Sequence, residues 1–158
     1  MDMNLEKIDE TKRQVLENLL EYYVYEFSPY LDIDVNEEGK YGFALVDEYV
    51  TDPQYSSYFI KHNEHLIGFV IVKELNDQDF NFCIEQFFIL KKYNGKGFGK
   101  KAATEAFNLY KGKWQITQTE TNYPAQAFWR SVIKEYTNNQ FSEFYDDKRR
   151  SVQRFENS

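Results

Sequence analysis

Three glycines at alternate positions, Gly95, Gly97 and Gly99, are the residues whose spacing most directly suggests chemistry. Glycine permits positive φ angles and a close approach of the backbone to a ligand. The residues that follow have helical spacing with small side chains on one side, and the first turn of a helix presents unpaired N–H groups. The helix dipole favours negative charge at that end, so the sequence predicts an anion site.

Two familiar phosphate-binding motifs are excluded. A Walker A loop requires a hydroxyl residue directly after its Gly-Lys pair, but Lys101 follows Lys100. A dinucleotide fingerprint requires its second and third glycines three residues apart, and here the glycines are two apart. Two interpretations remain, a pyrophosphate arm held mainly by backbone amides and an ordinary connection between a strand and a helix.

Residues 93–100, with the sequence YNGKGFGK, resemble the acyl-CoA pyrophosphate loop of the GNAT superfamily of N-acyltransferases. Gly97 and Gly99 match the last two positions of that loop, and Asn94 stands where Arg or Gln is usual. Five nearby lysines match a ligand with a pyrophosphate and a 3′-phosphate: Lys91, Lys92, Lys96, Lys100 and Lys101. The resemblance implies acetyl-CoA as cosubstrate, bound by Phe87, Phe88, Ile89, Gly95, Lys96, Gly97, Phe98, Gly99, Lys100 and Asn122.

A second segment is similar to a GNAT pattern of Asn, two residues, Ala, two residues and two aromatic residues. Asn122, Ala125 and Phe128 match it. The resemblance implies that Asn122 bonds the pantetheine or the acceptor, and its type also suits a helix N-cap, so both roles stay open. With the strands described below, the resemblance covers nearly the whole chain.

The resemblance implies direct acetyl transfer, in which a neutral amine attacks the thioester carbonyl. Backbone N–H groups near Phe88 or Ile89 would stabilise the developing oxyanion. A general base would remove the ammonium proton, directly or through water. Glu85 in the apolar strand and Glu120 on the adjoining strand are the two alternatives, unless either simply faces solvent.

One position departs from the family. A tyrosine often serves there as general acid for the leaving thiolate, whereas this chain has Trp129, which cannot donate a phenolic proton. Tyr123 and Tyr136 are nearby in sequence and are the alternatives. Because thiols have a pKa of about 8.5, the leaving group needs little help from an acid at neutral pH.

The elements that must position these residues follow from hydrophobic periodicity. We expect strands at residues 4–8, 55–61, 65–75, 81–90 and 113–121, and a final hairpin of residues 140–146 and 151–155. We expect helices at residues 10–27, 43–50, 100–111 and 125–136, the first ended by Ser28-Pro29. Gly68 within a strand predicts a bulge or a close backbone approach. These elements predict the fold class α/β (α+β), with a mixed, mostly antiparallel central sheet flanked by helices. The resemblance implies a single GNAT-like domain over residues 1–158.

The first long helix borders the acceptor cleft in the family, so the resemblance makes Tyr22, Tyr25, Glu26 and Tyr30 candidates for substrate contacts, with core or surface positions as the alternative.

The acidic loop at residues 32–41 lacks the glycine and glutamate positions of a calcium-binding loop. His62 and His65 have no metal-ligand spacing with other residues. No metal is therefore expected.

Composition limits the class of protein. The 158 residues carry a net charge of -7, which argues against nucleic-acid binding and is compatible with a cationic amine substrate. No apolar run is long enough for a membrane helix, the N-terminus lacks the pattern of a signal peptide, and Cys83 is the single cysteine. We expect a cytoplasmic protein that binds no membrane. A homodimer is one option for its assembly.

The expected function is transfer of an acetyl group from acetyl-CoA to a primary amine of a small molecule or a peptide. One alternative, favoured by Trp129, is a degenerate GNAT domain that binds acyl-CoA as a sensor or scaffold. A second is an unrelated α/β protein that binds a phosphorylated ligand. The acceptor depends on variable loops and is not given by the sequence.

Overall fold

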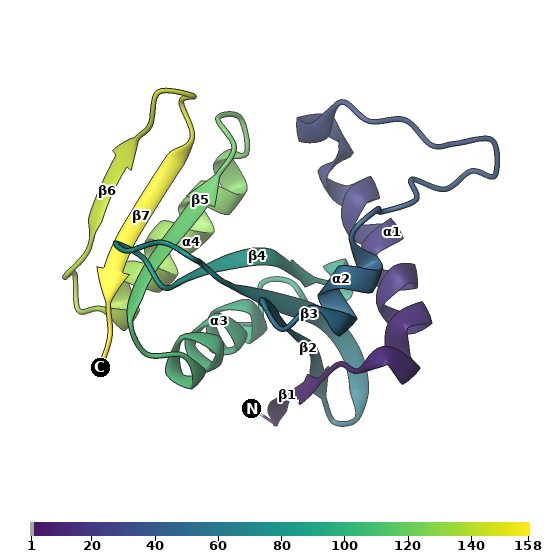
Figure 1. Ribbon diagram of the computed structural model, residues 1–158, viewed down its shortest axis with the longest axis horizontal. Coiled ribbons are helices and arrows are strands. Elements are labelled where there is room, and N and C mark those ends of the chain that lie inside the picture. Colours follow the sequence, from purple (N-terminus) through teal and green to yellow (C-terminus); the bar gives the residue numbers. More distant parts are fainter. Residues whose placement is uncertain (1) are drawn as a thin grey trace.

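The computed structural model describes residues 2–158 and contains one seven-stranded sheet with helices on both faces (Figure 1). The fold class expected from the sequence is confirmed. The strands are β1 (Met3–Lys7), β2 (Tyr55–His62), β3 (His65–Glu74), β4 (Phe82–Ile89), β5 (Lys113–Gln118), β6 (Ser142–Tyr145) and β7 (Ser151–Glu156). The helices are α1 (Arg13–Leu31), α2 (Val46–Thr51), α3 (Phe98–Leu109) and α4 (Tyr123–Tyr136), with 3-10 turns at Glu10–Lys12 and Lys91–Tyr93.

The sheet has the strand order β1-β2-β3-β4-β5-β7-β6, and every neighbouring pair is antiparallel except β4 and β5. These two parallel strands share a single paired position, Phe82 with Trp114. Beyond it the strands diverge, and Figure 1 shows β5 turning away from β4.

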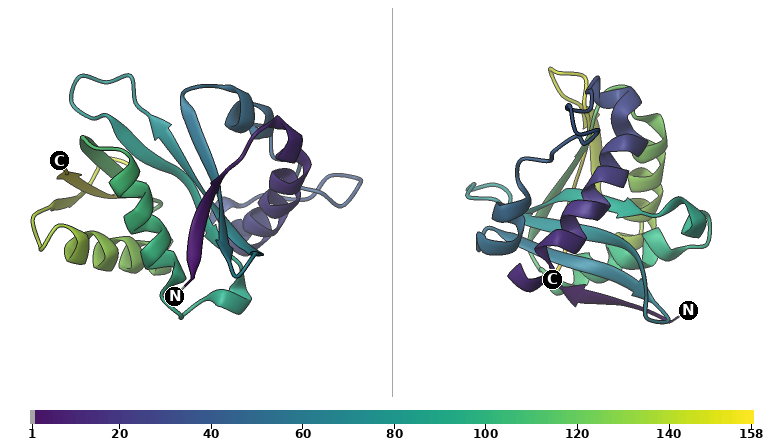
Figure 2. Two further views of the ribbon diagram at one scale, coloured as in Figure 1. Left: turned by 90° about the horizontal axis from the view of Figure 1, so that it is seen from below. Right: turned by 90° about the vertical axis from the view of Figure 1, so that its right-hand side faces the viewer.

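Helices cover both faces of the sheet (Figure 2), and each face has its own apolar core. On one face, α3 and α4 pack on the sheet around the buried rings of Phe107, Trp114 and Trp129. On the other face, α1 and α2 pack around Tyr49, Phe69 and Phe88. Because β4 contributes side chains to both cores, it is fixed from both sides while its edge toward β5 stays unpaired.

Helix α1 extends further than its sequence suggests. The expected end at Ser28-Pro29 is wrong, because Pro29 lies inside the helix, which ends at Leu31 before Asp32 in the left-handed region. Proline has no N–H for the carbonyl four residues earlier, which belongs to Tyr25. The hydroxyl of Ser28 donates to that carbonyl at 2.8 Å. This substitution of a side-chain bond for a backbone bond lets the helix continue beyond the proline.

A β-bulge interrupts β4 at Glu85. Ile71 of β3 pairs with Gln86 and Val72 pairs with Ile84, so Glu85 is an extra residue without a partner. Ile84 and Phe87 both pack against the core under α3 and α4, although strict alternation would place them on opposite faces. The bulge therefore turns both Glu85 and Gln86 toward the α1 and α2 side.

Gly68 confirms the close approach expected from its place in a strand. An added Cβ would lie 2.0 Å from the carbonyl oxygen of Phe88 on β4, and a register shift in β2 lies between Ile60 and Lys61, opposite this segment. Only glycine lets β3 and β4 pair at their normal separation here. The position of Phe88, one of the expected cofactor-binding residues, depends on it.

Replacing Gly68 by alanine should lower the free energy of unfolding by about 2 to 3 kcal/mol, because the backbone of β4 must move to accept the new methyl group. Urea denaturation followed by circular dichroism measures this loss. The control is Gly39→Ala, at φ +75° with no atom within 4 Å of the added Cβ, which carries only the cost of the left-handed conformation. Equal losses in the two variants would contradict the steric explanation.

Candidate active site

A cleft of about 620 Å³ opens beside β4. Its walls come from the end of α1, from β4, from the glycine loop before α3 and from α4. Most residues expected to bind acyl-CoA line it: Phe87, Phe88, Ile89, Gly95, Gly97, Gly99, Lys100 and Asn122. Lys96 and Phe98 do not, because Phe98 is buried in the core and the Lys96 ammonium lies over the ring of Tyr93.

The glycine loop has the backbone geometry of an anion cradle. Gly95 and Gly97 have φ angles of +76° and +84°, and Gly97 is the N-cap of α3. The Lys101 N–H donates to the Gly97 carbonyl oxygen at 3.2 Å. Among the described residues, it is the first N–H of this helical turn that has a backbone acceptor. A Cβ at Gly99 would lie 3.0 Å from the Phe128 ring, so bare backbone forms the wall there. These features fit a diphosphate group.

Two lysines beside the cleft are paired with glutamates of neighbouring helices. The Lys91 ammonium lies 3.4 Å from Glu26 of α1, and Lys100 forms an ion pair with Glu135 of α4. All four side chains are well exposed, so each pair contributes little to stability. Their weak pairing leaves both lysines able to turn toward a bound anion.

The unpaired edge of β4 presents two backbone amides to the gap. The N–H of Leu90 donates to the Ile67 carbonyl of β3 at 2.8 Å. Because amides alternate in direction along a strand, the N–H of Phe88 also points toward β3, and those of Phe87 and Ile89 point toward the gap. Of the two oxyanion donors considered from the sequence, Ile89 therefore has the accessible orientation.

A second cavity of about 160 Å³ continues from the cleft toward the α1 side of the sheet. It is lined in part by Tyr23, Glu85 and Gln86, together with residues of β5. Six residues line both cavities: Phe27, Tyr30, Phe87, Asn122, Ala125 and Trp129. The two spaces meet at these residues, so a group that extends from the glycine loop along β4 would reach the second cavity there.

Glu85 is held at the second cavity by Tyr49 of α2. The Tyr49 hydroxyl donates to Glu85 Oε2 at 3.0 Å and accepts a bond from Gln86 Nε2 at 3.0 Å. Burial is the main cause that raises the pKa of Tyr49, so the phenol stays a neutral donor. Burial, and after it the charge of Glu85, also raises the pKa of Tyr23 to about 12. Glu85 therefore faces neutral phenols from two helices.

The other expected catalytic residues lie away from both cavities. Glu120 is exposed after the end of β5 and lies 3.3 Å from Arg149. The Tyr136 hydroxyl donates to Asn108 at 2.8 Å and accepts from Asn157 at 3.0 Å, at the far end of α4. Tyr123 is 67% exposed and lines neither cavity. Glu85 is the one of the expected catalytic carboxylates that the fold brings to the cleft.

The candidates on α1 divide in the same way. Glu26 and Tyr30 line the larger cavity, whereas Tyr22 and Tyr25 are exposed and line neither. Asn122 accepts a bond from the Ala125 amide at 3.2 Å and also lines both cavities. It is thus the N-cap of α4, with one face still open to a ligand.

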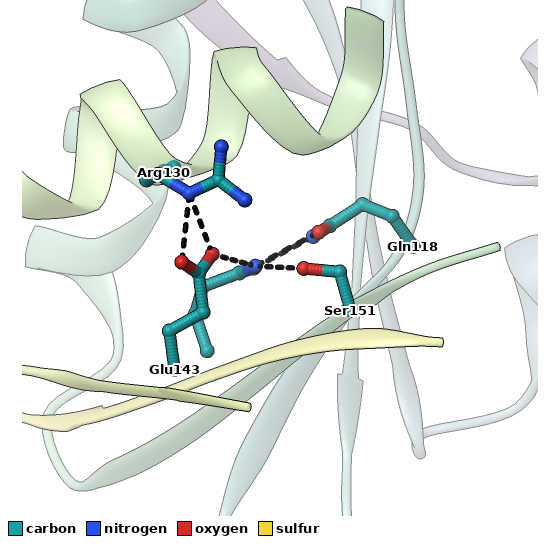
Figure 3. A network of polar contacts seen from close by, with 5 residues as sticks. Gln118, Arg130, Glu143 and Ser151 are labelled. Carbon is teal, nitrogen blue, oxygen red and sulfur yellow. Dashed lines mark hydrogen bonds and ion pairs between the residues drawn. The ribbon is translucent and has the colours of Figure 1, made fainter. Parts of the chain in front are cut away.

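A buried polar network fixes the far wall of the second cavity (Figure 3). Gln118 of β5 and Gln153 of β7 exchange two amide bonds of 2.8 and 2.9 Å. Gln153 also donates to Glu143 of β6 at 3.0 Å, and Glu143 accepts two bonds from Arg130 of α4 at 2.7 and 2.9 Å. The network joins three strands to α4 and so holds the diverging half of the sheet in place.

Sequence reasoning missed Tyr49 and Gln86 as parts of the site. The periodicity of the short helix at residues 43–50 predicts burial for Tyr49 but cannot name its partner. Gln86 would face away from Glu85 in a regular strand, and no residue type in the run signals the bulge.

Within residues 2–158 no cluster of three metal-ligating side chains occurs, and no helix there has the length and apolar character to cross a membrane.

Comparison with known proteins agrees with this geometry. Residues 13–132 match the model of the acetyltransferase (GNAT) family. An acetyltransferase of Thermus thermophilus has 14% identity and a TM-score of 0.68, with 99% of this chain and 97% of that chain covered. The PaiA N-acetyltransferase of Thermoplasma acidophilum, solved with coenzyme A, has 15% identity and a TM-score of 0.67, with 99% of each chain covered.

A spermidine N-acetyltransferase of Vibrio cholerae, solved with CoA and spermine, has 17% identity and a TM-score of 0.61, with 97% of this chain and 93% of that chain covered. At these identities the likeness concerns the fold. No curated protein gives a significant sequence match. Because the family model spans most of its length and the fold agrees throughout, the chain belongs to the GNAT acetyltransferase family.

Proposed function

We propose that this protein transfers an acetyl group from acetyl-CoA directly to a primary amine of a small molecule or peptide. The observation that carries the proposal is the continuity of the two cavities. A cradle for a diphosphate leads along an unpaired strand edge to a space that contains a hydrogen-bonded carboxylate. Acetyl transfer to an amine requires an acyl-CoA site, an oxyanion donor and a base in this order.

The cofactor end is assigned to the glycine loop. The amides of the first turn of α3 would bind the diphosphate, and Lys91 and Lys100 would leave their glutamate partners to bind phosphate oxygens. The pantetheine arm would then lie in the gap between β4 and β5. The amides of Phe87 and Ile89 are the donors available to it and to the thioester carbonyl.

The chemical step needs one base and one oxyanion donor from the chain. The amine nitrogen forms a bond to the thioester carbonyl carbon while the Ile89 amide stabilises the negative charge on oxygen. Glu85 takes the ammonium proton, directly or through one water. The C–S bond then breaks and sulfur leaves with the electron pair as a thiolate.

The second cavity favours a cationic acceptor with an apolar neighbourhood. It combines one carboxylate, Glu85, with the rings of Tyr23, Phe27 and Tyr30. An ammonium group gains from both a carboxylate and aromatic faces. Polyamines are the first acceptors to test, since a structural neighbour was solved with spermine, and peptides with a free N-terminus are the second.

One alternative has a specific observation in its favour. The tryptophan at position 129 replaces the tyrosine usual in the family, and a domain that binds acyl-CoA as a sensor or scaffold needs no acid there. Calorimetry with acetyl-CoA, CoA and ATP tests the binding site, and release of free thiol with a panel of amines tests catalysis. CoA-selective binding without thiol release from any amine would favour the sensor.

Gly97→Ala should weaken CoA binding at least about tenfold, because a side chain at φ +84° distorts the N-cap that aims the first amides of α3. Isothermal titration calorimetry measures the change in Kd. Gly39→Ala is the matched control, with a similar φ of +75° in the loop after α1, and it should bind CoA like the wild type. Equal weakening in both variants would show that the effect is general destabilisation.

Glu85→Gln should lower kcat/KM for the amine by about a hundredfold or more, with the Kd for acetyl-CoA unchanged, because the base is lost while the cleft keeps its shape. Steady-state assays of thiol release measure kcat/KM, and calorimetry measures the Kd for acetyl-CoA.

Tyr49→Phe should lower kcat about tenfold, because the Glu85 carboxylate loses the hydroxyl that orients it. For Glu85→Gln, the matched control is Glu120→Gln, which changes an exposed carboxylate outside the cavities. A loss of activity in the Glu120 variant as large as in the Glu85 variant would overturn the assignment of the base.

A further inference from the structure

We propose that the indole N–H of Trp129 donates a hydrogen bond to the sulfur of the acyl donor and stabilises the thiolate as it leaves. This inference rests on the proposed acetyl transfer and adds a catalytic residue to it. The tryptophan then takes part in the reaction through a hydrogen bond, without transferring a proton.

The first argument is the position of the side chain. Trp129 lines both the cleft of the glycine loop and the second cavity that contains Glu85. In direct transfer the sulfur lies between the pantetheine arm and the acyl carbon under attack. The junction of the two cavities is therefore where the C–S bond must break, and Trp129 is one of the residues at that junction.

The second argument is the state of its N–H group. The chain has two tryptophans, and the Nε1 atom of Trp114 donates to the Tyr110 carbonyl at 3.0 Å. No protein acceptor bonds the Trp129 Nε1 atom in the described residues, and the same residues contain no fully buried side-chain nitrogen or oxygen without a partner. The Trp129 N–H must therefore retain accessible surface. Because Trp129 is only 7% exposed and lines the two cavities, we assign that surface to their junction.

The third argument is that neighbouring rings hold the indole. Phe87 of β4 and Phe128 of α4 each lie 5.0 Å from it between ring centroids, at interplanar angles of 71° and 80°. Phe107 of α3 lies behind it at 6.3 Å. A donor fixed in this way needs no reorganisation when charge develops on sulfur, which is the condition for effective electrostatic stabilisation.

The chemistry balances without an acid from the chain. Indole nitrogen is a donor only and does not release its proton. The amine proton goes to Glu85, the C–S electron pair goes to sulfur, and the N–H of Trp129 bonds the resulting thiolate. A hydrogen bond to the charged form lowers the pKa of a thiol, so the same contact must act on bound CoA in the absence of any acceptor.

That consequence gives a test that does not require the amine. The thiol of enzyme-bound CoA is titrated by the ultraviolet absorbance of its thiolate, in the wild type and in Trp129→Phe. The pKa of the bound thiol should be about one unit higher in the variant, a tenfold change in its ionisation constant. An unchanged pKa with normal CoA binding would overturn the inference.

Two further proteins separate the N–H from the ring. Incorporation of 3-benzothienylalanine at position 129 keeps the shape of the side chain and replaces the N–H by sulfur, so it should reproduce the shift of Trp129→Phe. Tyr123→Phe removes the phenolic hydroxyl nearest in sequence and should leave the titration unchanged. A shift in the tyrosine variant, or none in the benzothienyl protein, would overturn the inference.

Binding of desulfo-CoA, which lacks the thiol, distinguishes this inference from the proposed function. Wild type and Trp129→Phe should bind it with the same Kd, because the analogue lacks the sulfur that the indole N–H contacts. A wild-type protein that binds neither CoA nor desulfo-CoA would refute the proposed function itself. A wild type that binds both, with a thiol pKa equal to that of Trp129→Phe, would refute only the role of the indole.

Discussion

The site depends on one interruption of the hydrogen-bonded sheet. After the single pair of Phe82 and Trp114, β4 and β5 separate, and neither strand edge has another strand beside it. Unpaired amides at a strand edge are costly when they are buried dry, so the gap must stay open to water or to a polar ligand. The two apolar cores and the network around Gln153 prevent the sheet from closing this gap.

The site also requires the bulge at Glu85, which lies on the same strand, β4, whose pairing with β5 ends after Phe82. The strand that loses its partner on one side also changes register with β3 on the other. This change brings a carboxylate and an amide to one hydroxyl, that of Tyr49, from consecutive positions on a strand. Gly68 keeps β3 close to the backbone of β4 a few residues later, so the distortion remains local.

Local signals predicted the elements and the loop, and long-range contacts decided the rest. The alternating glycines and the amphipathic spacing of α1 and α4 are read within one segment, so their structures could be predicted from the sequence. The continuation of α1 through Pro29 depends on the rotamer of Ser28, and a propensity rule cannot see it. The partner of Glu85 depends on the packing of α2 against a bulge, so the sequence kept both Glu85 and Glu120 as alternatives for the base. The fold separates them, since only Glu85 lines a cavity.

The features that fit the cleft to its ligand are also features that weaken the free protein. Lysines near the N-terminus of α3 oppose the helix dipole, Gly95 and Gly97 lower the stiffness of the loop, and the edge of β4 forgoes ladder bonds. Glutamates offset part of the charge at Lys91 and Lys100 only through exposed pairs. A dianionic ligand that follows β4 would offset the charge of the lysines, order the glycine loop and bond the unpaired amides of β4. Such a concentration of locally unfavourable choices is typical of a binding site, because a sequence selected for stability alone would have removed them.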